Sequence, residues 1–258
     1  MTDLPPMDFL LRLADAADRQ TLPRFRRHGT VDAKEGRYFD PVTEADREAE
    51  RAIRDLLGAE FPHHAILGEE FGASGEGPYT WVIDPVDGTR SFICGIPLWG
   101  TLIGLNVEGR AELGLLSQPY LGERFSAGPQ GAFLNGPGGQ RRLATRDTRA
   151  LADATLFTTA PELFAGPAKE RFGELSPRVR MSRYGADCYA FAMLADGHVD
   201  LCVETGLKPY DIVALIPIVE KAGGVISTWD GGRPEAGGDI LAAATPELHA
   251  AALEALRR

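Results

Sequence analysis

The sequence of 258 residues predicts an α+β or α/β layered fold, in which layers of helices and layers of β-sheet alternate. Three observations predict this class. Apolar side chains in residues 8–27 and 43–58 recur at helical spacing. Residues 65–134 contain short apolar runs separated by glycine, which is typical of antiparallel strands. From residue 155 onward, strand-like and helix-like segments take turns, as in layers packed around a core.

Two helices are expected first. Residues 8–27 carry an apolar stripe that includes Phe9 and Leu13. Residues 43–58 repeat alanine, isoleucine and leucine at the same spacing until a glycine and a proline end the pattern. Residues 29–41, between these two segments, are polar and contain glycine, so we expect a loop or an irregular hairpin there.

Strands follow the second helix. Ala65–Leu67 and Trp81–Ile83 are apolar runs bounded by turn residues, so each predicts a buried strand. Four further runs separated by short glycine-containing turns predict an antiparallel meander, namely Thr101–Leu105, Ala111–Ser117, Arg124–Ala127 and Ala132–Leu134.

The chain is predicted to divide near residue 145, because residues 136–149 are rich in glycine and arginine. Residues 1–145 would form an N-terminal α+β sub-domain, and residues 146–258 a C-terminal α/β sub-domain. In the second part we expect strands at Thr155–Thr159, Leu201–Glu204, Val225–Thr228 and Ile240–Ala243, and helices at Asp187–Ala195, Asp211–Ala222 and Pro246–Leu256. Pro217 should kink the middle one of these helices.

Composition and charge argue against several classes of function. The chain has 37 acidic and 27 basic residues, a formal charge of −10, which argues against a nucleic-acid partner. A basic cluster at Arg24, Arg26, Arg27 and His28 is diluted by acids around it. The apolar runs are shorter than the roughly 20 residues of a membrane span. The N-terminus lacks the features of a signal peptide.

The thiols and imidazoles predict no site. Cys94, Cys188 and Cys202 are too few and too scattered for a zinc site or a disulfide framework. We expect reduced thiols that serve as buried filler in a cytoplasmic protein. The five histidines match no zinc spacing, and no catalytic role is expected for them.

Oxygen donors concentrate in Asp84–Thr89, at the end of an apolar strand. Asp84 precedes a proline, which forces extended geometry and holds the carboxylate at the strand end. Asp87 comes three positions later, and the Val86 carbonyl lies between them. Compact sets of oxygen ligands are what Mg²⁺ prefers. The alternative is a plain surface turn, because Asp-Gly is a common turn pair.

Three other acidic positions each admit two interpretations. Glu69 follows another apolar run and is either a metal ligand or part of a solvated Glu-Glu pair. Asp211 either caps the helix that it begins or holds a cation. Asp46 either completes a capping box with Thr43 or faces the same cleft, and the spacing does not choose. Beyond Asp87, the start of a short segment at Gly88 offers backbone N–H groups that suit a phosphate.

Together these segments resemble the inositol monophosphatase superfamily. The matching stretches occur in the family's order across residues 34–245, and they are Asp40–Asp46, Gly68–Glu70, Trp81–Thr89, Gly131–Gly136, Pro209–Asp211 and Glu220–Gly224. The combination of Asp-Pro-Val-Asp-Gly-Thr with an upstream Gly-Glu-Glu is highly specific. The resemblance implies an αβαβα sandwich, a metal-dependent phosphomonoesterase activity and a homodimer.

The resemblance also implies roles for single residues. Two or three Mg²⁺ ions would be held by Glu69, Asp84, the Val86 carbonyl, Asp87 and Asp211. Asp46 and Thr89, with Glu69, would activate the attacking water. The substrate-binding residues would be Val86, Asp87, Gly88, Thr89, Arg183, Asp187, Glu204 and Asp211. Lys34 lies near the family's lysine, and its role stays open. A phosphomonoester carries close to two negative charges, so divalent cations are needed to reverse the sign of an acidic site.

Within the superfamily the chain is most similar to bacterial histidinol-phosphatases of the inositol monophosphatase type. The stretches that carry this similarity are Thr89–Ile93, Gly100–Ile103, Arg183–Tyr189 and Leu207–Asp211. Inositol phosphatases usually have small neutral residues where this chain has Gly185–Cys188, and tryptophan where it has Tyr210. Both departures weaken an assignment to inositol phosphate.

Asp187 and Glu204 would place two acids beside the leaving group, which suits a cationic alcohol such as histidinol. Asp187 alternatively caps the helix that starts there, and Arg183 is either a solvated side chain or one that reaches the substrate or a neighbouring active site.

The resemblance thus implies hydrolysis of histidinol phosphate to histidinol and phosphate, a reaction of histidine biosynthesis. The metal and phosphate site would lie in residues 1–145, and substrate recognition in residues 146–258. Two other hypotheses are an inositol-1-phosphate or broad-specificity phosphatase, and a catalytically silent metal- or phosphate-binding module. Because all of the metal-binding carboxylates are intact, we favour the enzyme.

Overall fold

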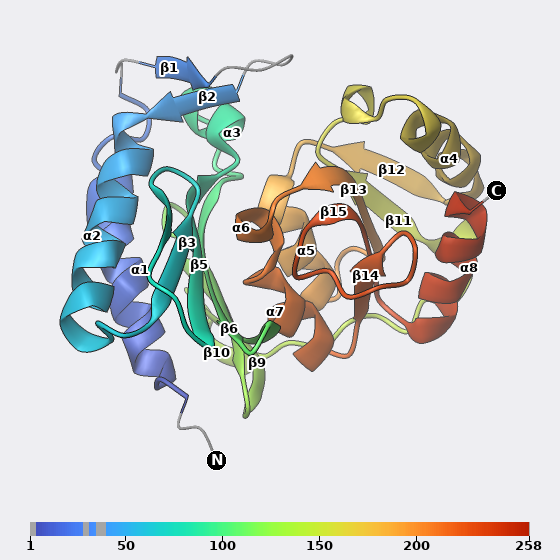
Figure 1. Ribbon diagram of the computed structural model, residues 1–258. Coiled ribbons are helices and arrows are strands. Elements are labelled where there is room, and N and C mark those ends of the chain that lie inside the picture. Colours follow the sequence, from blue (N-terminus) through green and yellow to red (C-terminus); the bar gives the residue numbers. More distant parts are fainter. Residues whose placement is uncertain (1–3, 28–30, 35–39, 258) are drawn as a thin grey trace.

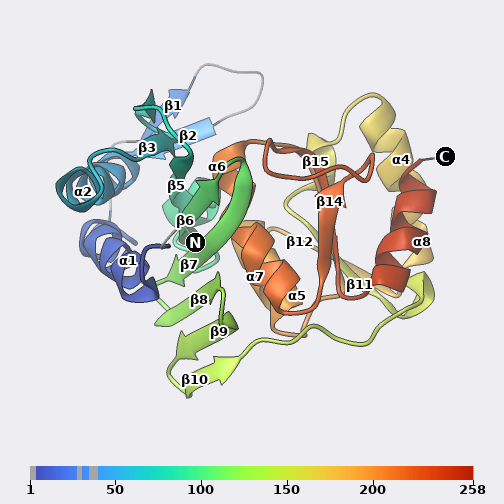
Figure 2. The same ribbon diagram turned by 60° about the horizontal axis from the view of Figure 1, so that its bottom comes forward.

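A computed structural model describes residues 4–27, 31–34 and 40–257, with the side chains of residues 33, 34, 40 and 41 left out of the description. Five layers succeed one another across the molecule (Figure 1). Helices α1 (Met7–Thr21) and α2 (Glu44–Glu60) cover a first sheet, and α4 (Pro167–Leu175) and α8 (Pro246–Leu256) cover a second. Figure 2 shows α5 (Asp187–Ala195) and α7 (Leu215–Lys221) between the two sheets. This order confirms the predicted layered class and the αβαβα sandwich.

The first sheet has eight strands in the described residues, in the order β10-β9-β8-β7-β6-β5-β3-β4. Strands β5 to β10 pair antiparallel in sequence order, which confirms the predicted meander, whereas β3 is parallel to β5. Their bounds are β3 Ala65–Gly68, β4 Gly72–Ser74, β5 Tyr79–Asp87, β6 Gly100–Val107, β7 Arg110–Gln118, β8 Glu123–Gly128, β9 Gly131–Gly136 and β10 Gly139–Arg142.

The second sheet is mixed, with described strands in the order β12-β11-β13-β15-β14. Strand β11 runs parallel to both of its neighbours, and β15 runs antiparallel to β13 and β14. The bounds are β11 Thr155–Thr158, β12 Met181–Tyr184, β13 Leu201–Leu207, β14 Val225–Thr228 and β15 Gly238–Ala243. A separate hairpin of β1 (Val31–Lys34) and β2 (Asp40–Thr43) precedes α2, in the region where a loop or hairpin was expected.

Buried apolar side chains join each pair of neighbouring layers. Phe9, Ile53 and Trp81 belong to the cluster between α1, α2 and the first sheet. A larger cluster connects the first sheet, the central helices and the second sheet, for example through Leu102 and Ile216. The predicted division near residue 145 falls in the stretch between β10 and β11 and remains a prediction. Because one cluster spans both parts, the apolar core continues across it.

The prediction of one continuous helix over residues 211–222 is wrong, because the structure has two helices in this region, α6 (Pro209–Ile212) and α7. Pro217 cannot donate to the carbonyl four residues earlier, and its ring would collide with it. A new helix that starts at Leu215 places Pro217 in the first turn, where no donor is missed. The break before Leu215 leaves Asp211 on a separate short helix.

Paired glycines in the first sheet let α7 approach it closely. Gly104 and Gly114 are partners on β6 and β7. A Cβ at Gly114 would lie 1.9 Å from the Ala214 oxygen, and one at Gly104 would lie 2.9 Å from the Ala214 nitrogen. The start of α7 therefore packs directly against the glycine backbone of β6 and β7, and this contact sets the depth at which α6 and Asp211 meet the first sheet.

Two other features differ from expectation or lie outside it. Helix α4 and strand β12 occupy residues between 160 and 186 for which no element was predicted. Cys188 and Cys202 are buried as expected, but Cys94 is exposed, so the expectation of buried filler is wrong for it. Among the helices of the described residues, none combines the length and apolar character needed to cross a bilayer.

Candidate active site

Strand β5 ends in the acidic segment that the sequence singled out. Its pairing with β6 shifts register between Asp84 and Asp87, which bends the strand at this point. The Thr101 hydroxyl donates to the Pro85 carbonyl at 2.8 Å, and the Val86 amide donates to Asp84 Oδ1 at 3.0 Å. These bonds hold the bent backbone, so that Asp84 is buried and Asp87 is half-buried.

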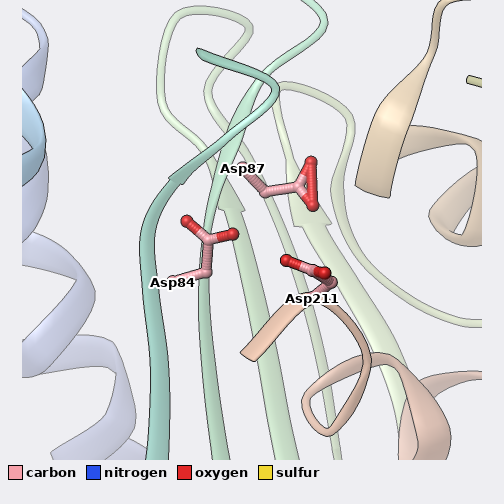
Figure 3. A group of neighbouring side chains, drawn as sticks. All are labelled: Asp84, Asp87 and Asp211. Atoms are coloured by element: carbon pink, nitrogen blue, oxygen red, sulfur yellow. The ribbon is translucent and has the colours of Figure 1, made fainter. Parts of the chain in front are cut away.

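Helix α6 brings Asp211 to the same place. One carboxylate oxygen each from Asp84, Asp87 and Asp211 lie within 4.8 Å of one another. Figure 3 shows the three carboxyl groups converging, two from the end of β5 and one from the short helix opposite. Oxygens bound to one octahedral Mg²⁺ are about 3 to 4 Å apart, given bonds of about 2.1 Å. The donor chemistry of the cluster therefore fits a divalent cation, and its oxygens lie near the spacing that such an ion requires.

The electrostatics of the cluster also fit a cation. Burial raises the pKa of the Asp84 carboxyl well above its ordinary value, and repulsion from Glu69, Asp87 and Asp211 raises it further. Burial together with Asp187 and Asp211 raises the pKa of Asp87 in the same direction. Neighbouring carboxylates resist ionisation because their charges repel one another. A cation bound between them makes their ionised form favourable.

Glu69 approaches the cluster from strand β3. Its amide donates to the Ile83 carbonyl at 3.1 Å, so its backbone lies beside the residue that precedes Asp84. Its charge is close enough to raise the pKa of the Asp84 carboxyl. The side chain is half-buried and lines the same cavity as Asp84 and Asp87, which does not fit the alternative of a solvated pair.

Asp46 completes the capping box and contacts Thr89, which lines the cavity, although Asp46 itself is buried and does not line it. Its Oδ2 accepts from the amide of Thr43 at 2.8 Å and from the hydroxyl at 2.5 Å, which completes the capping box of α2. Its Oδ1 lies 3.5 Å from the Thr89 hydroxyl, which is 3.0 Å from the Val86 carbonyl. Burial raises the pKa of Asp46 to about 6, so the carboxylate is a fair proton acceptor near neutral pH.

Gly88 turns the chain from β5 into α3 (Thr89–Ile93). Its φ of 83° lies in the left-handed region, and a Cβ would meet the Leu98 carbonyl at 3.0 Å. Only glycine fits this turn without strain. Beneath it, Val86 and Phe92 pack in a small cluster with Trp99, which holds Thr89 over the acidic groups.

A cavity of about 600 Å³ opens over these groups, and the second half of the chain forms its far wall. Asp187 and Glu204 lie on that wall, together with Thr159 and Lys208. Burial raises the pKa of the Asp187 carboxyl, and the Ser91 hydroxyl and the charge of Arg90, on the near side of the cavity, lower it in part. The cavity thus holds two acids besides the four that adjoin the cation position.

Asp187 does not cap α5, so that alternative is wrong. The helix has Ala186 at its N-cap position with no side-chain cap bond. Instead the Cys188 amide donates to Asp87 Oδ1 at 3.1 Å, and Asp187 accepts from the Ser91 hydroxyl at 3.2 Å. Asp187 adopts a φ of 45°, which is uncommon for a residue other than glycine. The two aspartates thereby connect β5 and α3 to α5.

Asp211 is not the first residue of its helix, but its carboxylate takes part in the capping box at the helix start. The N-cap of α6 is Lys208, and Asp211 stands third in the helix. Its Oδ2 accepts from the Lys208 amide at 2.6 Å. This bond orients the carboxylate back toward the helix start, at the face of the cavity.

Glu204 lies on β13 and is buried. Its Oε1 accepts from the Thr159 amide at 2.7 Å and from the Thr159 hydroxyl at 3.1 Å, and its Oε2 accepts from the Thr158 hydroxyl at 3.2 Å. Burial raises its pKa to about 8, and the nearby charge of Asp187 contributes. A cation in the cavity would favour the ionised form.

Arg183 is placed apart from these residues. It lies exposed on β12, at the edge of the second sheet, so within this chain it fits the solvated alternative. Lys34 ends β1, but its side chain is not described, and His28 lies outside the described residues. Sequence reasoning missed Arg90, Thr159 and Lys208 as lining residues; Arg90 and Lys208 adjoin predicted motifs, whereas nothing in the pattern marks Thr159.

Comparisons with known proteins agree with this fold. A model of the inositol monophosphatase family matches residues 6–258. The chain is 42% identical to the bifunctional phosphatase IMPL2 of Arabidopsis thaliana over 95% of this chain and 72% of that protein. It is 38% identical to a histidinol-phosphatase of Chlorobaculum parvum, with 93% and 92% covered. A solved inositol monophosphatase from Zymomonas mobilis superposes with a TM-score of 0.87 at 39% identity, covering 98% of this chain and 97% of that one.

Proposed function

Since the chain belongs to the inositol monophosphatase family, we propose that it is a Mg²⁺-dependent phosphomonoesterase that hydrolyses histidinol phosphate to histidinol and phosphate. The observation that carries the proposal is the pairing of two acidic groups in one cavity. One group surrounds the candidate cation position, and the other consists of Asp187 and Glu204 on the opposite wall.

Glu69, Asp84, the Val86 carbonyl, Asp87 and Asp211 would hold the Mg²⁺ ions. When bound, divalent cations supply an activated nucleophile and neutralise the charge of the phosphate. Gly88 and Thr89 would donate their backbone N–H groups to the phosphate at the start of α3.

Thr89 and Asp46 would move the proton of the attacking water. A water that donates to the Thr89 hydroxyl lets this hydroxyl donate in turn to Asp46 Oδ1, which lies 3.5 Å away. The raised pKa of Asp46, about 6, suits a base that works near neutral pH. The Thr43 bonds to Oδ2 leave Oδ1 as the oxygen that faces Thr89.

The far wall would select the leaving alcohol. Histidinol carries an ammonium group and an imidazole, whereas inositol carries hydroxyls alone. Asp187 and Glu204 would attract the cationic alcohol. Arg90 opposes this attraction in part, because it lies close enough to stabilise the charged form of Asp187.

The test compares phosphate release from histidinol phosphate and from inositol 1-phosphate, each with Mg²⁺ and with EDTA. We expect a strong preference for histidinol phosphate that disappears with EDTA. Equal or reversed rates would keep the metal chemistry and reject the substrate. No release from either ester, with Mg²⁺ bound, would favour a silent binding module.

An inositol phosphatase or a broad-specificity phosphatase is the second candidate. It is favoured by the similarity to the Zymomonas mobilis inositol monophosphatase and to a phosphatase described as bifunctional. The same two-substrate assay separates the candidates.

We further propose a cytoplasmic homodimer. Exposed Met181 and Tyr184 flank Arg183 on the edge strand β12, which supports a subunit contact there. The molar mass in solution, measured by light scattering as the protein elutes from a size-exclusion column, tests the dimer. If the dimer forms, Arg183→Ala tests whether this side chain serves a neighbouring site.

A further inference from the structure

Glu50 is a buried carboxylate for which the proposed reaction has no use. It lies on α2 one helical turn after Asp46, and its exposed fraction is 0%. A buried carboxylate is costly unless charge and hydrogen bonds compensate it. Its partners therefore indicate what this position stabilises.

Three donors converge on Glu50. The Glu70 amide donates to Oε2 at 2.7 Å, and the Phe71 amide donates to Oε1 at 3.2 Å. The Arg54 Nε also donates to Oε1, at 2.7 Å. Two of the three donors are thus consecutive backbone amides of the turn that follows β3.

This turn carries Glu69. The Glu69 amide is bound to the Ile83 carbonyl on β5, and the next amide is bound to Glu50. Gly68 packs directly on the carboxylate, since a Cβ there would lie 1.9 Å from Glu50 Oε1. The backbone on both sides of Glu69 is therefore fixed, one side by the sheet and the other by α2.

Arg54, one helical turn after Glu50, also binds the chain that follows β3. Its guanidinium donates to the Gly72 carbonyl and, at 3.0 Å, to the Ser74 hydroxyl of β4. Asp46, Glu50 and Arg54 follow one another at intervals of four residues, so they lie on one face of α2. That face contacts Thr89 at its start and the β3–β4 turn further along.

We propose that Glu50 is a positioning residue for the metal centre: its carboxylate fixes the Glu69 turn so that the Glu69 side chain is held toward Asp84. This inference rests on the proposed function, because it assumes that Glu69 and Asp84 bind Mg²⁺. It also assigns a role to Gly68 as the residue that leaves room for the Glu50 carboxylate.

Glu50→Gln tests the role with little change of shape. Every partner of Glu50 is a donor, so one end of the amide must face a donor with its own NH₂ group. The turn then loses at least one of its bonds. We expect Mg²⁺ affinity, measured by calorimetry, to fall about 10- to 100-fold, as is common for residues that orient metal ligands. Turnover should recover at high Mg²⁺.

Glu48→Gln is the matched control, because Glu48 lies on the same helix, half-buried, and pairs with Arg51. Its Mg²⁺ affinity should stay within about twofold of the unaltered protein. If Glu50→Gln lowers the melting temperature in EDTA but binds Mg²⁺ as tightly as the unaltered protein, the role is purely structural and the proposal is wrong.

A second variant tests the proposal if Glu50→Gln does not fold. Arg54→Gln removes one donor and keeps the carboxylate, so a smaller loss of Mg²⁺ affinity is expected, and unchanged affinity would overturn the proposal. Absence of Mg²⁺ binding by the unaltered protein would overturn the metal centre itself, and this role with it.

Discussion

Glu204 offers a quantitative test of the far wall of the cavity. Burial raises its pKa from 4.5 to about 8. The folded protein therefore keeps a proton that the unfolded chain releases between these two pH values, and its stability falls as pH rises through this window. At about 1.4 kcal/mol for each pH unit, the loss reaches about 5 kcal/mol above pH 8.

Glu204→Gln removes this loss, because glutamine stays neutral at every pH. Its Oε1 can still accept from the Thr159 amide, and its NH₂ group can donate to the Thr158 hydroxyl. We expect the variant and the unaltered protein to unfold with similar free energies at pH 4.5. At pH 8.5 the variant should be more stable by several kcal/mol.

The assay is urea unfolding in EDTA at a series of pH values. The other buried acids titrate in both proteins, so the difference between the two curves reports Glu204 together with its repulsion from Asp187. Exposed Glu247→Gln is the control and should leave the curve unchanged. Parallel curves for Glu204→Gln and the unaltered protein would refute the claim that an ionised Glu204 is costly in the folded state.

Three further predictions concern the site and its support. Asp84→Asn should reduce turnover by several orders of magnitude while circular dichroism shows the fold retained; near-normal turnover would refute its role as a metal ligand. Asp187→Ala should raise the KM for histidinol phosphate and should change little the hydrolysis of a phosphomonoester whose alcohol is neutral. An equal loss on both substrates would remove the argument from charge. Gly114→Ala should destabilise the protein by more than about 2 kcal/mol, because the new Cβ would lie 1.9 Å from the Ala214 oxygen. Gly58→Ala, in an open position on α2, should instead stabilise it by up to about 1 kcal/mol in the same urea assay, and the reverse order would contradict the packing described for α7.

Much of the fold could be predicted because its signals are local. Strands β6 to β9 are apolar runs with short turns between them, so their antiparallel order follows from the chain itself. The break between α6 and α7 follows from Pro217, but where it falls depends also on a contact with the first sheet. Pro217 marked the region, but the fit of Ala214 against Gly114 cannot be seen from the spacing of residues in one segment.

The acidic site could likewise be predicted from the sequence only in part. Asp84 and Asp87 could be singled out because a strand end and a proline restrict them. The interpretation of Asp187 as a cap failed, since Ala186 takes the N-cap position of α5 and the Asp187 carboxylate accepts from Ser91 on α3 instead. Glu50 escaped notice because in the sequence it is one more acid in a charged helix, and only the tertiary fold shows the turn that it holds.

The most direct test of the metal centre is a crystal soaked in Mn²⁺, which accepts the same oxygen ligands as Mg²⁺ and scatters anomalously. We predict an anomalous peak bonded to Asp84, Asp87 and Asp211, with Glu69 beside it. A crystal with ordered carboxylates and no peak among them would contradict the assignment of this cluster as the metal centre.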